Sequence, residues 1–396
     1  MEQFNRSNLL IFKRLIRKCM QSKCLILFLT FLFLNSCITQ FTPQTNEDKQ
    51  LLVVEGLITD QPVVNTIKLS KSIPLGTKST ANPLSGCIVS ISDDLGNTYQ
   101  LSETDSGNYV TDPALFKGEI GRKYSLHIKT NTLNHNYNYE SLPVEMKPVP
   151  PIDSVYYERK VIMETEGITT QEGCQVYLNT HDPANVCKFF RWEYTETWEI
   201  HIPYDVQNRV CWISNNSSVI NIKNTSVLEQ DKIERFPLLY ISNKTDRLKV
   251  KYSILVNQYS LTENEYLYWE KLQNLSEQVG SLYDLIPSDI SSNVYCIDNT
   301  NEKVLGYFSV SANSSKRIFI KDHFAGIYTQ YTDDNCVTSS FSGDGNIPYL
   351  NETVWVIETT TVPPGILIRV LTNIKGCADC TVRGSNIVPD FWNEGK

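Results

Sequence analysis

The sequence has few histidines, no excess of basic residues and no apolar run long enough to cross a bilayer. Its five histidines are scattered, without an HxH or HExxH arrangement, so the common zinc motifs are missing. Residues 1–36 hold six Lys/Arg and one Asp/Glu; removing them from totals of 36 and 44 leaves 30 basic and 43 acidic residues, a formal charge of −13. This balance argues against a surface for nucleic acid or anionic lipid.

Familiar catalytic motifs are also missing. The chain has neither a GxSxG nucleophile turn nor a glycine loop for phosphate. His181 and Asp182 are adjacent, and neighbours on a strand point apart, so a turn is favoured over a catalytic pair. Paired carboxylates of a glycosidase leave no recognisable spacing in a sequence. We therefore predict no enzyme activity, no cofactor and no metal.

What the chain does have is an export signal. Five Lys and Arg residues between positions 13 and 23 precede an apolar run from Cys24 to Leu34, about half the length of a spanning helix. Leu34-Asn35-Ser36-Cys37 resembles a bacterial lipobox, so we expect residues 1–36 to be a signal peptide, with Met20 as an alternative start, and Cys37 to carry the lipid. The competing interpretation is an unmodified cysteine in a buried helix.

Residues 37–50 are polar and contain proline, as expected of a lipidated tether between membrane and folded domain. The plentiful Asn-x-Ser/Thr sequons would suit a eukaryotic secreted protein, but they are expected by chance in a chain rich in Asn and Ser. A lipid anchor holds a protein to a membrane without a spanning helix. The expected location is the outer membrane, on its periplasmic or its cell-surface face.

Eight cysteines follow Cys37, an even number that permits up to four disulfides in an oxidising compartment. The spacing does not define the connectivity, and the disulfide candidates are Cys211, Cys336, Cys377 and Cys380. Cys377-Ala-Asp-Cys380 has the spacing of a redox dithiol, but it lies near the chain end without a strand-then-helix setting. A structural disulfide clip is therefore favoured there.

Hydrophobic patterning predicts a mainly β protein of two domains. Residues 51–147 contain six or seven short strand candidates separated by turns, which fits an immunoglobulin-like or prealbumin-like β-sandwich. Within it Val89 and Ile91 alternate with polar residues and should face the core. Residues 142–154 carry four prolines and mark the boundary. Residues 148–396 are expected to form a larger antiparallel β domain.

One amphipathic helix, at about 262–280, is expected to interrupt the second domain. Thr262 and Glu265 form a capping-box pattern, in which each side chain bonds the other residue's amide. An apolar stripe follows at helical spacing, made of Tyr268, Leu272, Leu275, Val279 and Leu282. Beyond the helix, residues 303–321 are expected to form a hairpin.

Two features could bind a ligand. Trp192, Tyr194 and Trp198 share one face of a strand candidate and could form an aromatic platform for sugars or peptides, the alternative being packing in the core. Residues 331–352 lack hydrophobic periodicity and contain oxygen ligands suited to calcium, without the EF-hand spacing: Asp333, Asp334, Asp344 and Glu352.

The order of these segments resembles the Bacteroidota lipoproteins called domain of unknown function 4249. The resemblance is carried by the lipobox together with LLVVEGLITD, SGCIVSISDDLGNTYQL, PPIDSVYY, FFRWEYTETW, YLYWEKLQNLSEQVGSLYD, KVLGYFSVS and CADCTVRGSNIVPDFW. It implies an outer-membrane or surface lipoprotein, often encoded beside TonB-dependent receptors, and no established activity. The acidic run that often follows the lipidated cysteine in surface-exported lipoproteins is missing here.

Together these features predict a lipid-anchored cell-envelope protein, a non-enzymatic accessory or binding lipoprotein that acts with an outer-membrane TonB-dependent receptor in nutrient uptake. An envelope hydrolase of unassigned chemistry and a purely structural envelope module are the alternatives. A pocket that joins two carboxylates, or a nucleophile beside a base, would favour the hydrolase, whereas a flat or convex surface with exposed aromatic side chains would favour binding.

Overall fold

The computed structural model describes residues 50–73, 82–131, 136–163, 170–277, 290–321, 327, 336–342 and 354–394. Residues 50–396 form one compact unit. The described part of this unit is mainly β, as the sequence predicts, and its strands form five sheets in which they pair antiparallel apart from one parallel pair. No helix among the described residues is long and apolar enough to cross a membrane.

Two sheets pack as the first sandwich. Sheet A contains β1 (Leu52–Ile58), β2 (Thr66–Lys71), β3 (Asn82–Pro83), β6 (Ser102–Asp105), β7 (Asn108–Val110) and β19 (Val304–Val310). Sheet B contains β4 (Ile88–Asp93), β5 (Thr98–Gln100), β8 (Lys123–Lys129), β9 (Asn138–Ser141), β10 (Val144–Glu145) and β18 (Val294–Cys296). Val89 and Ile91 are fully buried in the core between these sheets, so their predicted orientation is confirmed.

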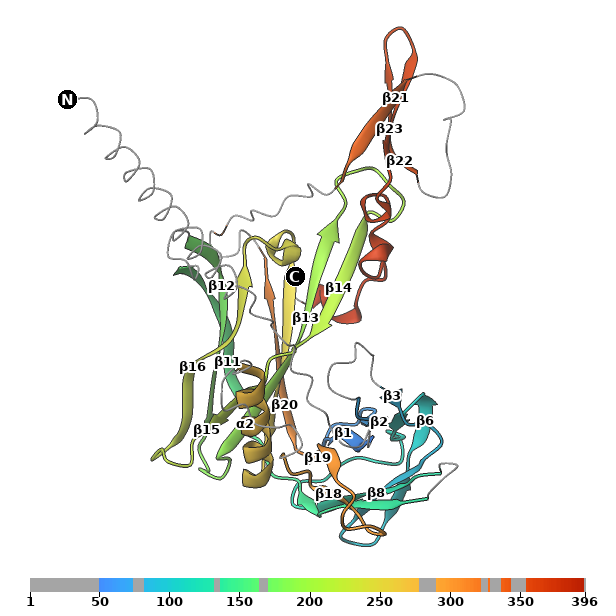
Figure 1. Ribbon diagram of the computed structural model, residues 1–396. Helices are drawn as coiled ribbons and strands as arrows, with labels where there is room; N and C mark the ends of the chain where they lie inside the picture. The colour runs from blue at the N-terminus through green and yellow to red at the C-terminus, as the bar shows by residue number, and fades with distance from the viewer. Residues whose placement is uncertain are drawn as a thin grey trace, which may run out of the picture. The chain divides into compact units, whose positions relative to one another are not determined.

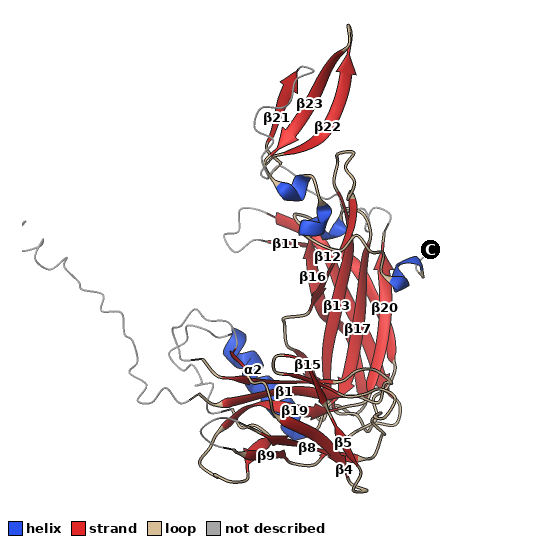
Figure 2. Ribbon diagram, turned by 90° about the vertical axis from the view of Figure 1, so that its right-hand side faces the viewer, coloured by secondary structure: helices blue, strands red, loops and turns tan. Residues whose placement is uncertain are grey.

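The second sandwich consists of longer strands, which Figure 2 shows as two layers. Sheet C contains β11 (Ile152–Met163), β12 (Thr170–Asp182) and β16 (Asp231–Ser242). Sheet D contains β13 (Phe189–His201), β14 (Val210–Asn216), β15 (Asn221–Asn224), β17 (Tyr252–Ser260) and β20 (Asn313–Ile320). Tyr252, Ile254 and Val256 alternate along β17 and are fully buried between the layers, as expected of a strand with one apolar face.

The remaining elements lie near the C-terminus or between strands of the second sandwich. A three-stranded sheet contains β21 (Thr338–Ser342), β23 (Ile366–Thr372) and β22 (Trp355–Val362) in that order (Figure 1). Short 3-10 turns are η1 (Asp246–Leu248), η4 (Lys375–Cys377), η5 (Cys380–Val382) and η6 (Asp390–Asn393).

The chain crosses between the sandwiches more than once. The proline-rich stretch joins β10 of the first sandwich to β11 of the second, while β18 and β19, from beyond residue 290, return to the first. The hairpin expected at residues 303–321 is wrong, because β19 pairs with β1 in parallel whereas β20 pairs with β17. The buried link between them is held by Ser311, whose Oγ accepts from the Ser260 amide at 2.9 Å. Alternation along a strand does not specify its partner.

The predicted helix is α2 (Glu263–Glu277), which lies beside β13 and β15 (Figure 1). Thr262 caps it as expected, because its Oγ1 accepts from the Glu265 amide at 3.3 Å. The Glu265 carboxylate does not complete the capping box; it is buried beside Trp269, whose Nε1 donates to it at 3.4 Å. Val279 and Leu282 of the expected stripe lie outside the described residues.

Candidate binding site

A cleft of about 400 Å³ lies where α2 meets strands of both sandwiches. This volume is typical of small-molecule sites. Sheet A supplies its residues from β1, β2 and β19, sheet D from β13, and the helix closes one side. The lining side chains combine charge with aromatic rings, and they include Glu55, Lys68, Arg191, Glu193, Tyr268, Trp269, Tyr307 and Ser309.

Arg191 is the central charged group of this cleft. It lies on β13, its exposed fraction is only 5%, and its guanidinium carbon is 4.2 Å from the ring centroid of Trp269 and 5.2 Å from that of Tyr259. Such distances allow cation–π attraction, which is strengthened by the loss of water. Glu193, two residues along the same face of the strand, forms an ion pair with Arg191 Nη1 at 2.9 Å.

Glu265 lies behind the lining side chains and is completely buried. Burial raises the pKa of its carboxyl, an effect opposed by the nearby charge of Arg191. Among the described residues its Oε2 has no hydrogen-bond partner, and the same is true of Arg191 Nε. Two buried polar atoms without partners beside one cleft are unusual in a protein interior.

Aromatic rings form the helix side of the cleft. Tyr268 lies with its ring centroid 4.8 Å from that of Tyr307 and 5.4 Å from that of Trp269. Burial raises the pKa of Tyr268 to about 12, so its hydroxyl stays neutral and can donate a hydrogen bond. A second cleft of about 520 Å³ shares Tyr268 and Tyr307 with the first and is lined by three lysines, Lys123, Lys147 and Lys271.

The chemistry of these side chains suits the binding of an anion. Arg191 and the rings can hold a flat anionic group, whereas Glu265, the buried carboxyl with a raised pKa, does not line the cleft. Two carboxylates do line it, Glu55 and Glu193, as expected of a hydrolase pocket, but Glu193 is paired with Arg191 and Glu55 lies opposite Lys68 in the register of β1 and β2. Among the described residues, no group of three or more His, Cys, Asp or Glu side chains could hold a metal ion.

The aromatic platform predicted on β13 is not at the surface. Trp192, Tyr194 and Trp198 are 0%, 5% and 6% exposed, so their rings lie in the core of the second sandwich. Trp192 stacks on Phe190, with ring centroids 5.8 Å apart, and its Nε1 donates to Gln258 Oε1 at 2.8 Å. The interpretation as an exposed binding face is therefore wrong, because sheet C covers this side of β13.

Sequence reasoning missed the opposite face of the same strand. Arg191 and Glu193 alternate with the buried aromatics and point toward α2. On the helix, Glu265 and Trp269 are four residues apart and therefore share a face. A glutamate on a helix face that is otherwise apolar was the sequence signal that could have indicated this site. His181 does not pair with Asp182; its Nδ1 lies 2.7 Å from Asp153 Oδ2 at an exposed position.

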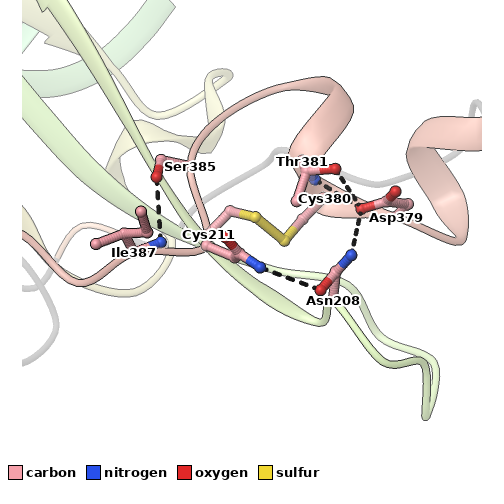
Figure 3. The surroundings of a disulfide bond; sticks show 8 residues. Asn208, Cys211, Asp379, Cys380, Thr381, Ser385 and Ile387 are labelled. Carbon is pink, nitrogen blue, oxygen red and sulfur yellow. Dashed lines mark hydrogen bonds between the residues drawn. A yellow bond between two sulfur atoms is a disulfide. The ribbon is translucent and has the colours of Figure 1, made fainter.

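All four disulfide candidates form disulfides, but not the expected clip. Cys380 bonds Cys211, and Cys377 bonds Cys336, so the two cysteines of the Cys377-Ala-Asp-Cys380 segment pair with distant partners. Figure 3 shows the Cys211–Cys380 bond joining β14 to the C-terminal segment. Asp379 accepts there from Asn208 Nδ2 at 3.0 Å, and it accepts also from the Thr381 hydroxyl at 2.7 Å.

Two further predictions lie outside the described residues. Cys37 and its tether precede residue 50, and the calcium candidates Asp333, Asp334, Asp344 and Glu352 fall in undescribed positions. Both stay predictions.

The fold and cleft together define a class: two linked β-sandwiches with one helix that borders a ligand-sized cleft. Residues 38–317 match the model of a family described as a domain of unknown function, DUF4249. The chain belongs to this family. The match includes every residue of the cleft and Cys211, whereas Cys336, Cys377 and Cys380 lie beyond it. No match was found among curated proteins.

Proposed function

We propose that this protein is a Bacteroidota cell-envelope lipoprotein, anchored to the outer membrane through Cys37, whose folded part binds without catalysis and acts with a TonB-dependent receptor in nutrient uptake. The observation that carries the binding function is the cleft around Arg191, which combines a buried cation with three aromatic rings. A purely structural module has no need, at an open cleft, of a buried cation whose Nε lacks a partner among the described residues.

The disulfides support the proposed compartment. Disulfides persist in oxidising environments such as the bacterial periplasm and the cell surface. Both bonds link segments far apart in the chain, with sequence separations of 169 and 41, so they stabilise the exported fold as structural bonds. This favours export over a cytoplasmic location.

Lipidation is tested in cells that express the full chain with an alkyne fatty acid in the medium. The native protein should be labelled and recovered with membranes, whereas Cys37→Ser should lose the label and leave the membrane fraction. Cys24→Ser is the matched control, because it removes a cysteine from the apolar run and leaves the lipobox intact. Equal labelling and membrane recovery of Cys37→Ser would refute the anchor.

Partnership is tested by affinity capture of the native lipoprotein from membranes solubilised in mild detergent. A TonB-dependent receptor should be recovered with the native protein and be absent from a capture of an unrelated tagged lipoprotein. Recovery of the protein alone, after crosslinking in intact cells as well, would contradict the partnership.

A further inference from the structure

Arg191 lies at the cleft with more hydrogen-bonding capacity than the described residues use. It is 95% removed from solvent, and rings of Trp269 and Tyr259 restrain its guanidinium group. Its Nε has no partner among the described residues, and its ion pair with Glu193 is a single contact from Nη1. A buried charge that is incompletely paired costs stability. A ligand that formed more hydrogen bonds with the guanidinium group would recover part of that cost.

Glu193 has the properties of an internal stand-in for a ligand. Its side chain is 43% exposed, so it can exchange its contacts with Arg191 and the Tyr259 hydroxyl for water, whereas Arg191 is fixed in the wall. A single contact is the weaker mode of guanidinium–carboxylate pairing, since the planar fork favours two parallel hydrogen bonds. A carboxylate entering from the cleft can therefore replace Glu193.

The other charges of the cleft leave Arg191 as the natural anchor for an anion. Lys68 of β2 and Glu55 of β1 lie directly opposite each other in the antiparallel register, so their charges offset one another. Once Glu193 turns away, the other carboxylate among the described lining residues is Glu55, which faces Lys68, while Glu265 lies buried behind the wall, so Arg191 can take an anion from the cleft. The adjacent rings of Tyr268, Trp269 and Tyr307 present apolar faces to whatever group enters.

We propose that this cleft binds a small carboxylate carried on a ring, with the carboxylate replacing Glu193 on Arg191 and the ring packed against Trp269 and Tyr268. The ring is either a sugar, as in a uronic acid, or an aromatic ring. This inference rests on the proposed binding function and adds the chemical class of its ligand. A cleft of about 400 Å³ holds one or two such rings.

Binding is measured by titration calorimetry on the full-length protein in detergent. The probes are glucuronate and digalacturonate, indole-3-acetate and phenylacetate, and the neutral compounds glucose, galactose and indole. Binding of the uronates alone identifies a sugar ligand, and binding of the aromatic acids alone identifies an aromatic one; both results support the proposal. Neutral compounds that bind as tightly as the acids would overturn it.

Two variants locate the binding. Glu193→Gln removes the competing carboxylate and should tighten binding of the acids about tenfold, the scale of one charge-assisted contact, without affecting neutral compounds. Arg191→Lys keeps the charge but loses the fork and should weaken acid binding about tenfold. Glu158→Gln is the matched control, since Glu158 pairs with Arg235, which also stacks on a tyrosine ring, at an exposed position.

Thermal unfolding of each variant verifies that it folds. If Arg191→Lys does not fold, Glu193→Gln still tests the inference. The inference fails if no acid binds to either the native protein or Glu193→Gln. The proposed function then still stands if a receptor is captured from membranes. Conversely, if the acids bind but no receptor is captured, the inference is supported and the proposed partnership is contradicted.

Discussion

The guanidinium carbon of Arg191 lies 4.2 Å from the ring centroid of Trp269, and this contact joins strand β13 to helix α2. Trp269 also donates its Nε1 hydrogen to Glu265, so one indole contacts the buried cation through its ring and the buried carboxyl through its edge. The three residues form a single electrostatic unit at the back of the cleft. Changes to any one of them should alter both stability and binding.

Glu265 should make the protein less stable as pH rises. Its folded pKa lies above the ordinary value of 4.5, so the folded state binds more protons than the unfolded state from about that pH upward. Excess protons on the folded state mean that the free energy of unfolding falls with increasing pH. Glu265→Gln removes this dependence. The free energy of unfolding of the variant, relative to that of the native protein, should therefore increase as the pH is raised from 4 to 8.

Urea unfolding at several pH values measures the effect. Glu270→Gln, the same exchange at a partly exposed carboxyl on the same helix, is the control variant. Identical slopes for Glu265→Gln and the native protein would show that the buried carboxyl does not titrate differently on folding.

Gly306 should tolerate no side chain. It adopts a φ of +86° on β19, and a Cβ there would lie 1.9 Å from the carbonyl oxygen of Val54 on the paired strand. Gly96 has almost the same φ, +85°, with open space around it. Gly96→Ala should therefore cost only the left-handed backbone penalty, about 1–2 kcal/mol. Gly306→Ala should cost about 4 kcal/mol or more, as severe core defects do.

Denaturant unfolding gives the loss in free energy of unfolding for each alanine variant. Gly96→Ala reports the backbone penalty alone, and Gly306→Ala reports that penalty together with the steric clash. Equal losses would mean that β1 and β19 can separate enough to admit a methyl group, which the parallel register from Leu52 to Ile58 argues against.

The two disulfides should contribute unequally to stability. In the chain-entropy model the loss grows with loop length, giving about 5 kcal/mol for Cys211–Cys380, with a separation of 169, and about 4 kcal/mol for Cys336–Cys377, with a separation of 41. Paired serine replacements should lower the melting temperature in that order. Removing all four cysteines should make the melting temperature insensitive to dithiothreitol, and an unchanged native melting temperature under reducing conditions would contradict the prediction.

Local patterns predicted much of the secondary structure. Alternation placed Val89 and Ile91 in a core, and a capping residue with helical spacing placed α2, because each of these depends on neighbours within a few residues. The same alternation placed Trp192, Tyr194 and Trp198 on one face correctly, but it could not tell whether that face met water or another sheet. Sheet C, which comes from other parts of the chain, decided that point.

Pairing over long distances was not predictable in this way. The patterns of β19 and β20 suit a hairpin as well as they suit two separate sheets, and the parallel contact with β1 depends on a strand more than two hundred residues earlier. Four cysteines likewise permit several pairings, and the close approach of β14 to the C-terminal turns selected Cys380 for Cys211.

The sequence by itself determined the β-rich class, the one described helix, the acidic charge and the segment that resembles a lipobox, since these follow from composition and short-range spacing. Only the tertiary structure decided the cleft, because Arg191, Trp269 and Tyr307 come from three separate elements. A buried charge becomes a binding group through the neighbours that exclude water from it, and those neighbours are brought together by folding.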